Sequence, residues 1–304
     1  MTIDIRPLRE NDLPEADRIF RLAFGTFLGL PDPTTFAAGA DLIGTRWRAP
    51  ASNATFGAFD GETLVGSNYA ASWGSFGFFG PLTVRPDFWS KGIAQRLLEP
   101  TMDVFARWGV RQSGLFTFPQ SPKHLALYQK FDFWPQRLTA LMAKPAAAAG
   151  KAEGAFDGSR AELLAQARAV TDTVFAGLDV SGEINAVLDQ SLGEVVTVRD
   201  RDSLAAFAVC HVGPRSEAGP NAVYVKFAAA RDDRQFGALL AACEALAVRR
   251  GMGVVTAGVN TACHDAYRTM AAQGYRTQFT GVAMQRGNGA GYLGPGAYVL
   301  GDWR

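Results

Sequence analysis

Residues that could bind an anionic group lie between a strand-like segment and the start of an amphipathic helix. Phe76–Val84 is apolar and aromatic, which is typical of a buried strand. From Ile93 the apolar residues recur at helical spacing. The loop between them carries Lys91 and Gly92 and has no acidic residue after Asp87. Because the first N–H groups of a helix are unpaired and glycine lets a ligand approach the backbone closely, this loop is predicted to bind a phosphate.

At this loop the sequence resembles the GNAT superfamily of acyl-CoA-dependent N-acyltransferases. The family signature is Gln/Arg-x-x-Gly-x-Gly/Ala after a central strand. Trp89–Ala94 occupies that frame. Gly92 and Ala94 match the signature, whereas Trp89 stands where the family has Gln or Arg.

A second segment resembles the late helix of the same family, which is usually written Asn…Leu-Tyr-x-x-x-Gly-Phe. It runs from Ser121 to Phe133 and follows the strand-like Ser113–Phe118. Ser121 replaces the usual Asn, and Asp132 replaces the usual Gly. The resemblance covers residues 1–143.

The resemblance implies a site for acetyl-CoA as the acyl donor and no metal. In such families the central strand holds the pantetheine and the thioester carbonyl, and the loop holds the pyrophosphate. The residues at these places are Leu82, Thr83, Val84, Trp89, Ser90, Lys91, Gly92, Ile93, Ala94 and Gln95.

The resemblance also places a tyrosine of the late helix near the thioester sulfur, and Tyr128 matches it. A phenol with a pKa near ~10 is protonated at pH 7 and can donate a proton to the departing thiolate. An ordinary packed tyrosine is the alternative. No general base is visible, since Phe76–Val84 contains no Asp or Glu. His124, four residues before Tyr128, could relay a proton, although a histidine that faces solvent is the more common case.

Composition limits the other functions that the chain could have. A length of 304 residues is enough for two domains of ordinary size. The net charge is +1 and charged residues make up 19%, so neither nucleic acid nor a membrane surface is expected as a partner. Three widely spaced cysteines suit neither a disulfide framework nor a metal site. Met1–Arg6 lacks the pattern of a signal peptide, so a cytoplasmic location is expected.

The order of predicted elements indicates two similar α/β (α+β GNAT-like) domains in tandem, each a mixed, mostly antiparallel sheet flanked by helices. We expect a catalytic domain at 1–143 and a degenerate copy at 159–304. The Ala-rich residues 144–158 contain little that could pack and are predicted to form a linker.

An alignment without gaps places Leu82–Trp134 on Tyr224–Arg276. In this register Gly92 corresponds to Arg234, Ser90-Lys91 to Asp232-Asp233, and Tyr128 to Met270. Two carboxylates at a helix start would cap its N–H groups and repel a phosphate. The second half is therefore predicted to bind no cofactor, unless the register is wrong and Tyr267 takes the role of Tyr128.

The sequence thus predicts a tandem GNAT acetyltransferase, monomeric or homodimeric. It would move an acetyl group from acetyl-CoA to a primary amine of a small molecule or peptide, by direct attack in a ternary complex. Two alternatives stay open. One is a non-catalytic acyl-CoA-binding regulator, and the other is an aminoacyl transferase of the tandem-GNAT type.

Overall fold

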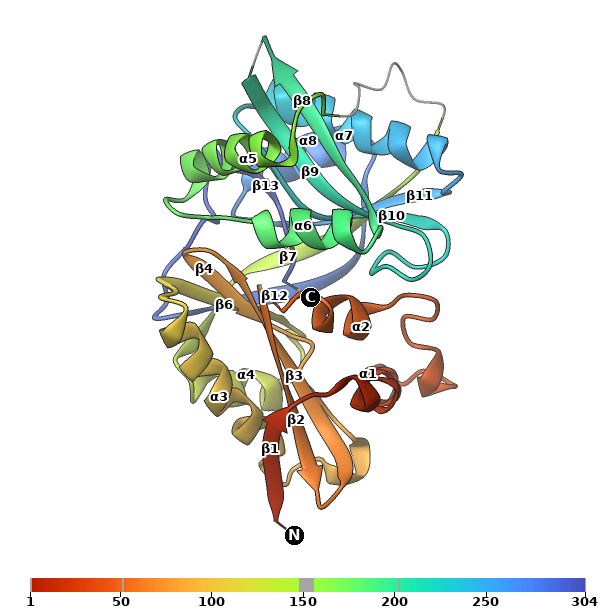
Figure 1. Ribbon diagram of the computed structural model, residues 1–304, viewed down its shortest axis with the longest axis vertical. Coiled ribbons are helices and arrows are strands. Elements are labelled where there is room, and N and C mark those ends of the chain that lie inside the picture. The colour runs from red at the N-terminus through yellow and green to blue at the C-terminus, as the bar shows by residue number, and fades with distance from the viewer. Residues whose placement is uncertain (1, 51, 148–155, 202, 304) are drawn as a thin grey trace.

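Two successive sets of strands and helices in similar order build the chain (Figure 1). The computed structural model describes residues 2–50, 52–147, 156–201 and 203–303. The first set is β1 (Ile3–Pro7), η1 (Glu10–Asp12), α1 (Leu13–Leu28), η2 (Pro33–Thr35), α2 (Leu42–Trp47), β2 (Asn53–Asp60), β3 (Thr63–Trp73), β4 (Phe76–Phe79), β5 (Thr83–Val84), η3 (Pro86–Phe88), α3 (Ile93–Arg107), β6 (Gln112–Thr117), α4 (Pro122–Gln129) and β7 (Phe133–Pro145).

The second set follows the residues that were predicted to form a linker. It comprises α5 (Arg160–Val174), α6 (Ser181–Asp189), β8 (Gly193–Asp200), β9 (Ser203–Val212), β10 (Ala222–Ala230), α7 (Asp233–Arg249), β11 (Val254–Asn260), α8 (His264–Ala272), β12 (Arg276–Arg286) and β13 (Tyr298–Leu300). None of the described helices is long and apolar enough to cross a membrane.

The described strands form one sheet that runs through both halves. Its order is β1-β2-β3-β4-β6-β12-β7-β11-β10-β9-β8, with β5 beside β3 and β13 beside β10. Only β4–β6 and β10–β11 are parallel among the recorded pairs of described strands. The mostly antiparallel α/β class is therefore confirmed. The halves exchange strands at the centre, because β12 lies between β6 and β7, and β7 lies between β12 and β11.

The predicted linker begins too early in the sequence. Lys144 and Pro145 are the last residues of β7 and pair with Val255 and Val254. The run of small residues hides this extension, because the pairing partner lies more than a hundred residues away. Residues 148–155 of the predicted linker are outside the described part of the chain. The division of the chain into two domains around these residues remains a prediction.

The predicted single strand Phe76–Val84 is divided into β4 and β5. Between them lie Gly80, Pro81 and Leu82, and the N–H of Gly80 still donates to the carbonyl of Tyr69 in β3. Proline has no N–H to donate, so the ladder is interrupted there. Hydrophobic periodicity could not show this interruption, because the residues on both sides are apolar.

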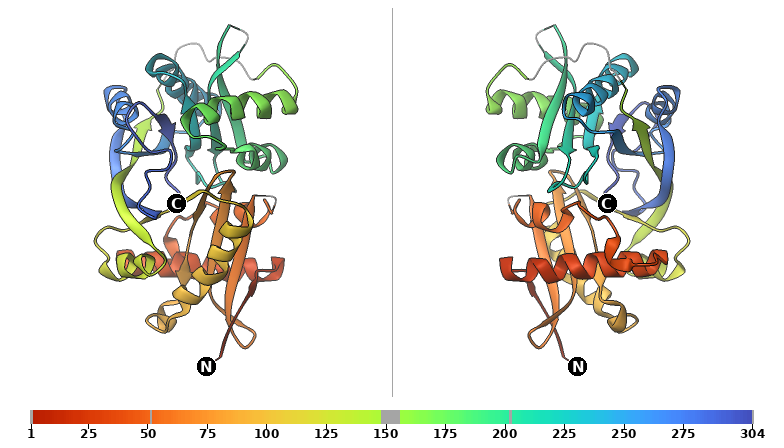
Figure 2. Two further views of the ribbon diagram at one scale, coloured as in Figure 1. Left: turned by 90° about the vertical axis from the view of Figure 1, so that its left-hand side faces the viewer. Right: turned by 90° about the vertical axis from the view of Figure 1, so that its right-hand side faces the viewer.

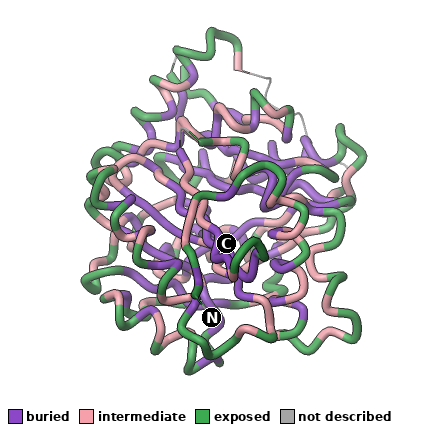
Figure 3. The backbone as a smooth tube through the Cα atoms, turned by 60° about the horizontal axis from the view of Figure 1, so that its bottom comes forward, coloured by how far each residue is buried: buried purple, intermediate pink, exposed green. Residues whose placement is uncertain are grey.

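One hydrophobic core continues across the boundary between the halves. Trp73 of β3 lies against Phe227 of β10, with ring centroids 5.1 Å apart, and Phe76 lies against Trp303 at 4.9 Å. Figure 3 shows the buried backbone concentrated in the centre of the molecule. Figure 2 shows the halves stacked along the long axis, with the C-terminal end between them. The second half is thus placed to contribute side chains to a site in the first.

Candidate active site

A first cavity of about 440 Å³ lies between the loop before α3 and the late helix α4. Its lining includes nearly all of the residues predicted to hold the cofactor: Leu82, Thr83, Val84, Trp89, Ser90, Gly92, Ile93, Ala94 and Gln95. Tyr128 lines it as well. Lys91 is not part of this lining, and its Nζ lies 4.3 Å from the centre of the Phe88 ring.

The start of α3 is open to an anion. Gly92 is the N-cap residue with φ of 77° and offers no side chain to the first turn, and Ser90 also has a left-handed φ of 63°. The N–H groups of that turn therefore have no capping side chain. Lys123 and Lys130 line the cavity, and none of its described lining residues is acidic. These features are favourable for phosphates.

Trp89, which departs from the signature, links the loop before α3 to strand β5 by a hydrogen bond. Its indole Nε1 donates a hydrogen bond to the carbonyl of Val84, at 2.6 Å. The side chain is 40% exposed and borders the first cavity. The residue therefore fixes the loop against β5 while leaving an aromatic surface at the cavity.

A second cavity of about 480 Å³ adjoins the first at α4 and is walled by both halves. Residues of α1, of the loop between β4 and β5, and of β6 come from the first half; Glu217–Pro220, Phe279 and Trp303 come from the second. The two cavities share Phe24, Leu82, Phe118, His124 and Tyr128. Sequence reasoning missed the residues of the second half, because no local pattern links them to the loop.

Tyr128 stands where the two cavities meet. Its side chain is buried, and its ring centroid lies 5.7 Å from that of Phe79. Burial raises the pKa of Tyr128 to about 12, and a hydrogen bond with the Thr117 side chain opposes this rise. The phenol is therefore protonated throughout the neutral pH range and can act as a proton donor.

His124 lines both cavities and is not a fully exposed surface histidine. The residue is half-buried, and its ring centroid lies 4.9 Å from that of Phe27 and 6.5 Å from that of Tyr128. Its Nδ1 is buried without a hydrogen-bond partner. Burial lowers the pKa of His124, which favours the neutral imidazole. A neutral ring with an unpaired nitrogen can accept a proton.

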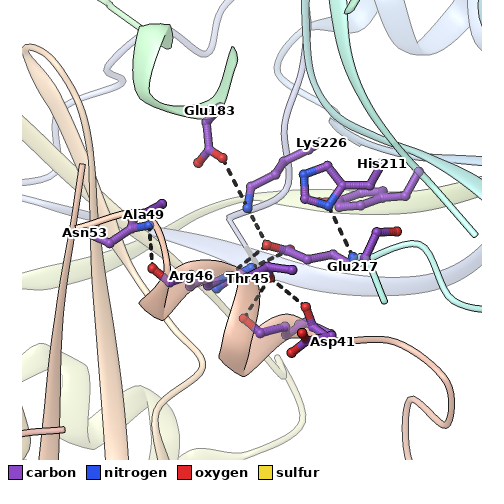
Figure 4. A network of polar contacts seen from close by, with 12 residues as sticks. Asp41, Thr45, Arg46, Ala49, Asn53, Glu183, His211, Glu217 and Lys226 are labelled. Atoms are coloured by element: carbon purple, nitrogen blue, oxygen red, sulfur yellow. Dashed lines mark hydrogen bonds and ion pairs between the residues drawn. The ribbon is translucent and has the colours of Figure 1, made fainter. Parts of the chain in front are cut away.

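A buried network of charges holds the wall of the second cavity (Figure 4). Glu217 accepts hydrogen bonds from Nε and Nη2 of Arg46 at 3.1 and 2.9 Å, and it is ion-paired with Lys226. Lys226 also lies 3.3 Å from Glu183, which accepts a hydrogen bond from Trp73. Although burial opposes it, the charges of Arg46 and Lys226 hold the pKa of Glu217 well below its usual range. Glu217 is thus a fixed carboxylate and a poor proton acceptor.

The model of the acetyltransferase (GNAT) family matches residues 17–133, which contain the loop before α3, Tyr128 and His124. These residues therefore form a GNAT acetyltransferase domain. Acetyl-CoA-dependent N-acetylation is the general reaction of this family. No curated protein sequence matches the chain at a significant level.

Solved structures share the fold of the GNAT domain together with the second half. One is a protein from Pyrococcus horikoshii assigned provisionally as an acetyltransferase, with a TM-score of 0.69, 14% identity, and coverage of 97% of this chain and 93% of that one. A GCN5-related N-acetyltransferase from Sphaerobacter thermophilus has a TM-score of 0.56 and 15% identity, and the match covers 93% and 95%. A glucosamine N-acetyltransferase region of a fungal β-N-acetylglucosaminidase has a TM-score of 0.64 and 13% identity, covering 93% of this chain and 38% of that one.

Among its described residues, the second half has no counterpart of the loop that precedes α3 in the GNAT domain. Eight residues separate β5 from α3, whereas two separate β10 from α7. Strand pairing makes Ala229, and not Val225, the counterpart of Thr83. The predicted alignment of Leu82–Trp134 with Tyr224–Arg276 is therefore wrong at its start, because the loop itself is missing. That the second half binds no cofactor stays a prediction.

The C-terminal segment fills the place in the second half that corresponds to the first cavity. In the GNAT domain β5 pairs only with β3 among the described strands, and the cavity borders its other side. In the second half, Ala228–Ala230 pairs with β13 on that side, and the N–H of Gly301 donates to Gly258 of β11. The side chain of Asp232 caps α7 by accepting from the N–H of Gln235, at 2.8 Å. Both the groove and the helix start are thus occupied by the chain itself.

Proposed function

We propose that the chain transfers the acetyl group of acetyl-CoA to the primary amine of a small molecule. The observation that carries this proposal is the meeting of two cavities at Tyr128 and His124. The first cavity has the open helix start and the lysines that suit the phosphates of the donor. The second, which the other half of the chain helps to enclose, is the place for the acceptor.

In this proposal the two side chains divide the proton transfers. The amine nitrogen attacks the thioester carbonyl, and its surplus proton passes to Nδ1 of His124. The C–S bond then breaks, and the hydroxyl of Tyr128 gives its proton to the sulfur, so that an amide and free CoA are formed. His124 returns its proton to solvent, from which Tyr128 is reprotonated. General acid and base groups typically contribute ~10²- to 10⁴-fold each.

The second domain, residues 159–304 in our proposed division, acts as the wall of the acceptor site. Glu217 joins that wall to Arg46 of α2 through a buried ion pair. A cavity of this size suits a small amine better than the end of a folded protein. We propose that the protein works in the cytoplasm as a monomer or homodimer.

The test is release of CoA thiol from acetyl-CoA in the presence of a panel of primary amines. We expect turnover with at least one small amine, and formation of its N-acetyl product by mass spectrometry. Binding of acetyl-CoA without acetylation of any amine would instead favour a regulatory protein. Activity with an aminoacyl-tRNA donor and none with acetyl-CoA would indicate an aminoacyl transferase.

A further inference from the structure

The walls of the second cavity are mostly apolar. Aromatic side chains from both halves dominate the surface: Phe24, Phe36, Phe79, Phe116, Phe279 and Trp303. Small or aliphatic residues of the η2–α2 segment and of the loop before β10 fill most of the remainder. A molecule held here would place most of its surface against hydrocarbon.

The few polar side chains of these walls are already engaged, except near the reacting centre. Glu217 is bonded to Arg46 and Lys226, and the carbonyl of Gly80 accepts a hydrogen bond from Nη1 of Arg46 at 2.5 Å. The Thr117 side chain is hydrogen-bonded with Tyr128. Among the described lining residues, Nδ1 of His124 is the buried side-chain atom that lacks a partner. A polar atom of the acceptor therefore finds an unengaged partner beside His124 and Tyr128.

The charges around the second cavity also favour an acceptor with an uncharged body. Glu217 is the one carboxylate among the described residues of the lining, and two cations neutralise it. No lysine or arginine side chain belongs to the described lining. A second ammonium group or a carboxylate on the acceptor would lose its water without gaining an opposite charge.

We propose that the acceptor is a primary amine on an uncharged, apolar body, for which 2-phenylethylamine serves as the probe. This inference rests on the proposed acetyl transfer and specifies the substrate class of that site. The amine reaches the junction of the cavities at His124 and Tyr128, while an aryl or alkyl group packs among the phenylalanines. Sugars, polyamines and amino acids with a free carboxylate are excluded by the same walls.

The substrate test compares 2-phenylethylamine with glucosamine, spermidine and phenylalanine, and expresses kcat/KM per neutral amine. Phenylalanine is the matched compound, because it adds only a carboxylate to the same body. We expect 2-phenylethylamine to exceed each of the others at least about tenfold, because buried polar groups without partners are strongly disfavoured. Equal or faster acetylation of glucosamine or spermidine would overturn the inference and leave the acetyl transfer intact.

Titration calorimetry separates failure of the inference from failure of the reaction. If no amine is acetylated, the proposed function fails, and binding decides the inference. The protein is saturated with CoA and titrated with 2-phenylethylamine and then with phenylalanine. Tighter binding of 2-phenylethylamine supports an apolar site, and binding of neither compound overturns it.

Variants of Phe279 test whether the second half supplies this specificity. Phe279 lines the second cavity but not the first, and its ring lies 5.7 Å from that of Phe118. Phe279→Ser should lower kcat/KM for 2-phenylethylamine about tenfold or more, with an unchanged Kd for acetyl-CoA. The control is Leu138→Ser on the adjacent strand, where the side chain is 46% exposed, and it should change neither value.

A second variant keeps the test decisive if Phe279→Ser does not fold. Phe279→Trp preserves an apolar wall and reduces the free volume, so the preference should move from 2-phenylethylamine to the shorter benzylamine. An unchanged preference in a folded Phe279→Trp variant would overturn the placement of the aryl group beside this residue.

Discussion

The proposed role of Tyr128 as a proton donor depends on its hydroxyl group alone. Tyr128→Phe removes the hydroxyl that would protonate the CoA thiolate and keeps the ring packed against Phe79. We expect kcat to fall ~10²- to 10⁴-fold, with little change in the Kd for acetyl-CoA. Steady-state kinetics and calorimetry on the variant provide both values. A variant with wild-type kcat would show that the tyrosine only packs and that water supplies the proton.

The pH profile distinguishes the donor from the acceptor of protons. Burial lowers the pKa of His124 below its ordinary 6.5, so the imidazole is neutral above that pH and loses its capacity as a base only as the pH falls through the lowered pKa. With kcat/KM expressed per neutral amine, we expect a plateau from about pH 6.5 upwards and a fall on the acidic side. The plateau should extend past pH 10, because the pKa of Tyr128 is about 12.

His124→Asn is the matching variant for that profile. It should lower the plateau ~10²- to 10⁴-fold and abolish the acidic limb that His124 causes. The same limb in His124→Asn would assign the titration to another group and reject His124 as the base. Acetyl-CoA binding, measured in parallel, shows whether the variant is still folded around the donor.

At the scale of elements, the loop and the first turn of α3 should determine affinity for acetyl-CoA. A Cβ at Gly92 would meet no atom within 4 Å, so Gly92→Glu would direct a carboxylate into open space beside the first cavity. Like charge at the helix start opposes the phosphates, and we expect the Kd for acetyl-CoA to rise at least about tenfold. Titration calorimetry measures the change.

The control for that variant must carry the same backbone strain. Gly61 also has a left-handed φ, 60° against 77° at Gly92, and a Cβ there would likewise meet nothing within 4 Å. Gly61→Glu lies in the turn between β2 and β3, so it should destabilise the fold to a similar degree and leave the Kd unchanged. Equal Kd values for acetyl-CoA in the two variants would show that the loop does not bind the phosphates.

At the scale of the whole molecule, one chain should bind one acetyl-CoA. The second half repeats the element order of the first, and this order alone would suggest two sites. However, β13 fills the groove beside β10, and Asp232 caps α7. Calorimetry should therefore give a stoichiometry of one per chain. A value near two, with one site surviving Gly92→Glu, would show that the second half binds the cofactor as well.

The fold class, and most of the residues that line the first cavity, could be predicted because their signals are local. The periodicity of its apolar residues predicts helix α3. Gly92 and the absence of acidic residues after Asp87 indicate the loop before it. Tyr128 follows at a fixed distance on a short helix. Residues that act together within one loop or one helix turn leave a pattern in the sequence, because the chain itself sets their spacing.

The second cavity was decided only by the tertiary structure. Phe24, Glu217 and Trp303 are far apart in the chain, and they converge because β12 and β7 are exchanged between the halves and the C-terminal segment returns along β10. The same non-local pairing converted part of the predicted linker into strand. A cavity is the space that packed elements leave between them, so its lining carries no spacing rule that a single sequence could show.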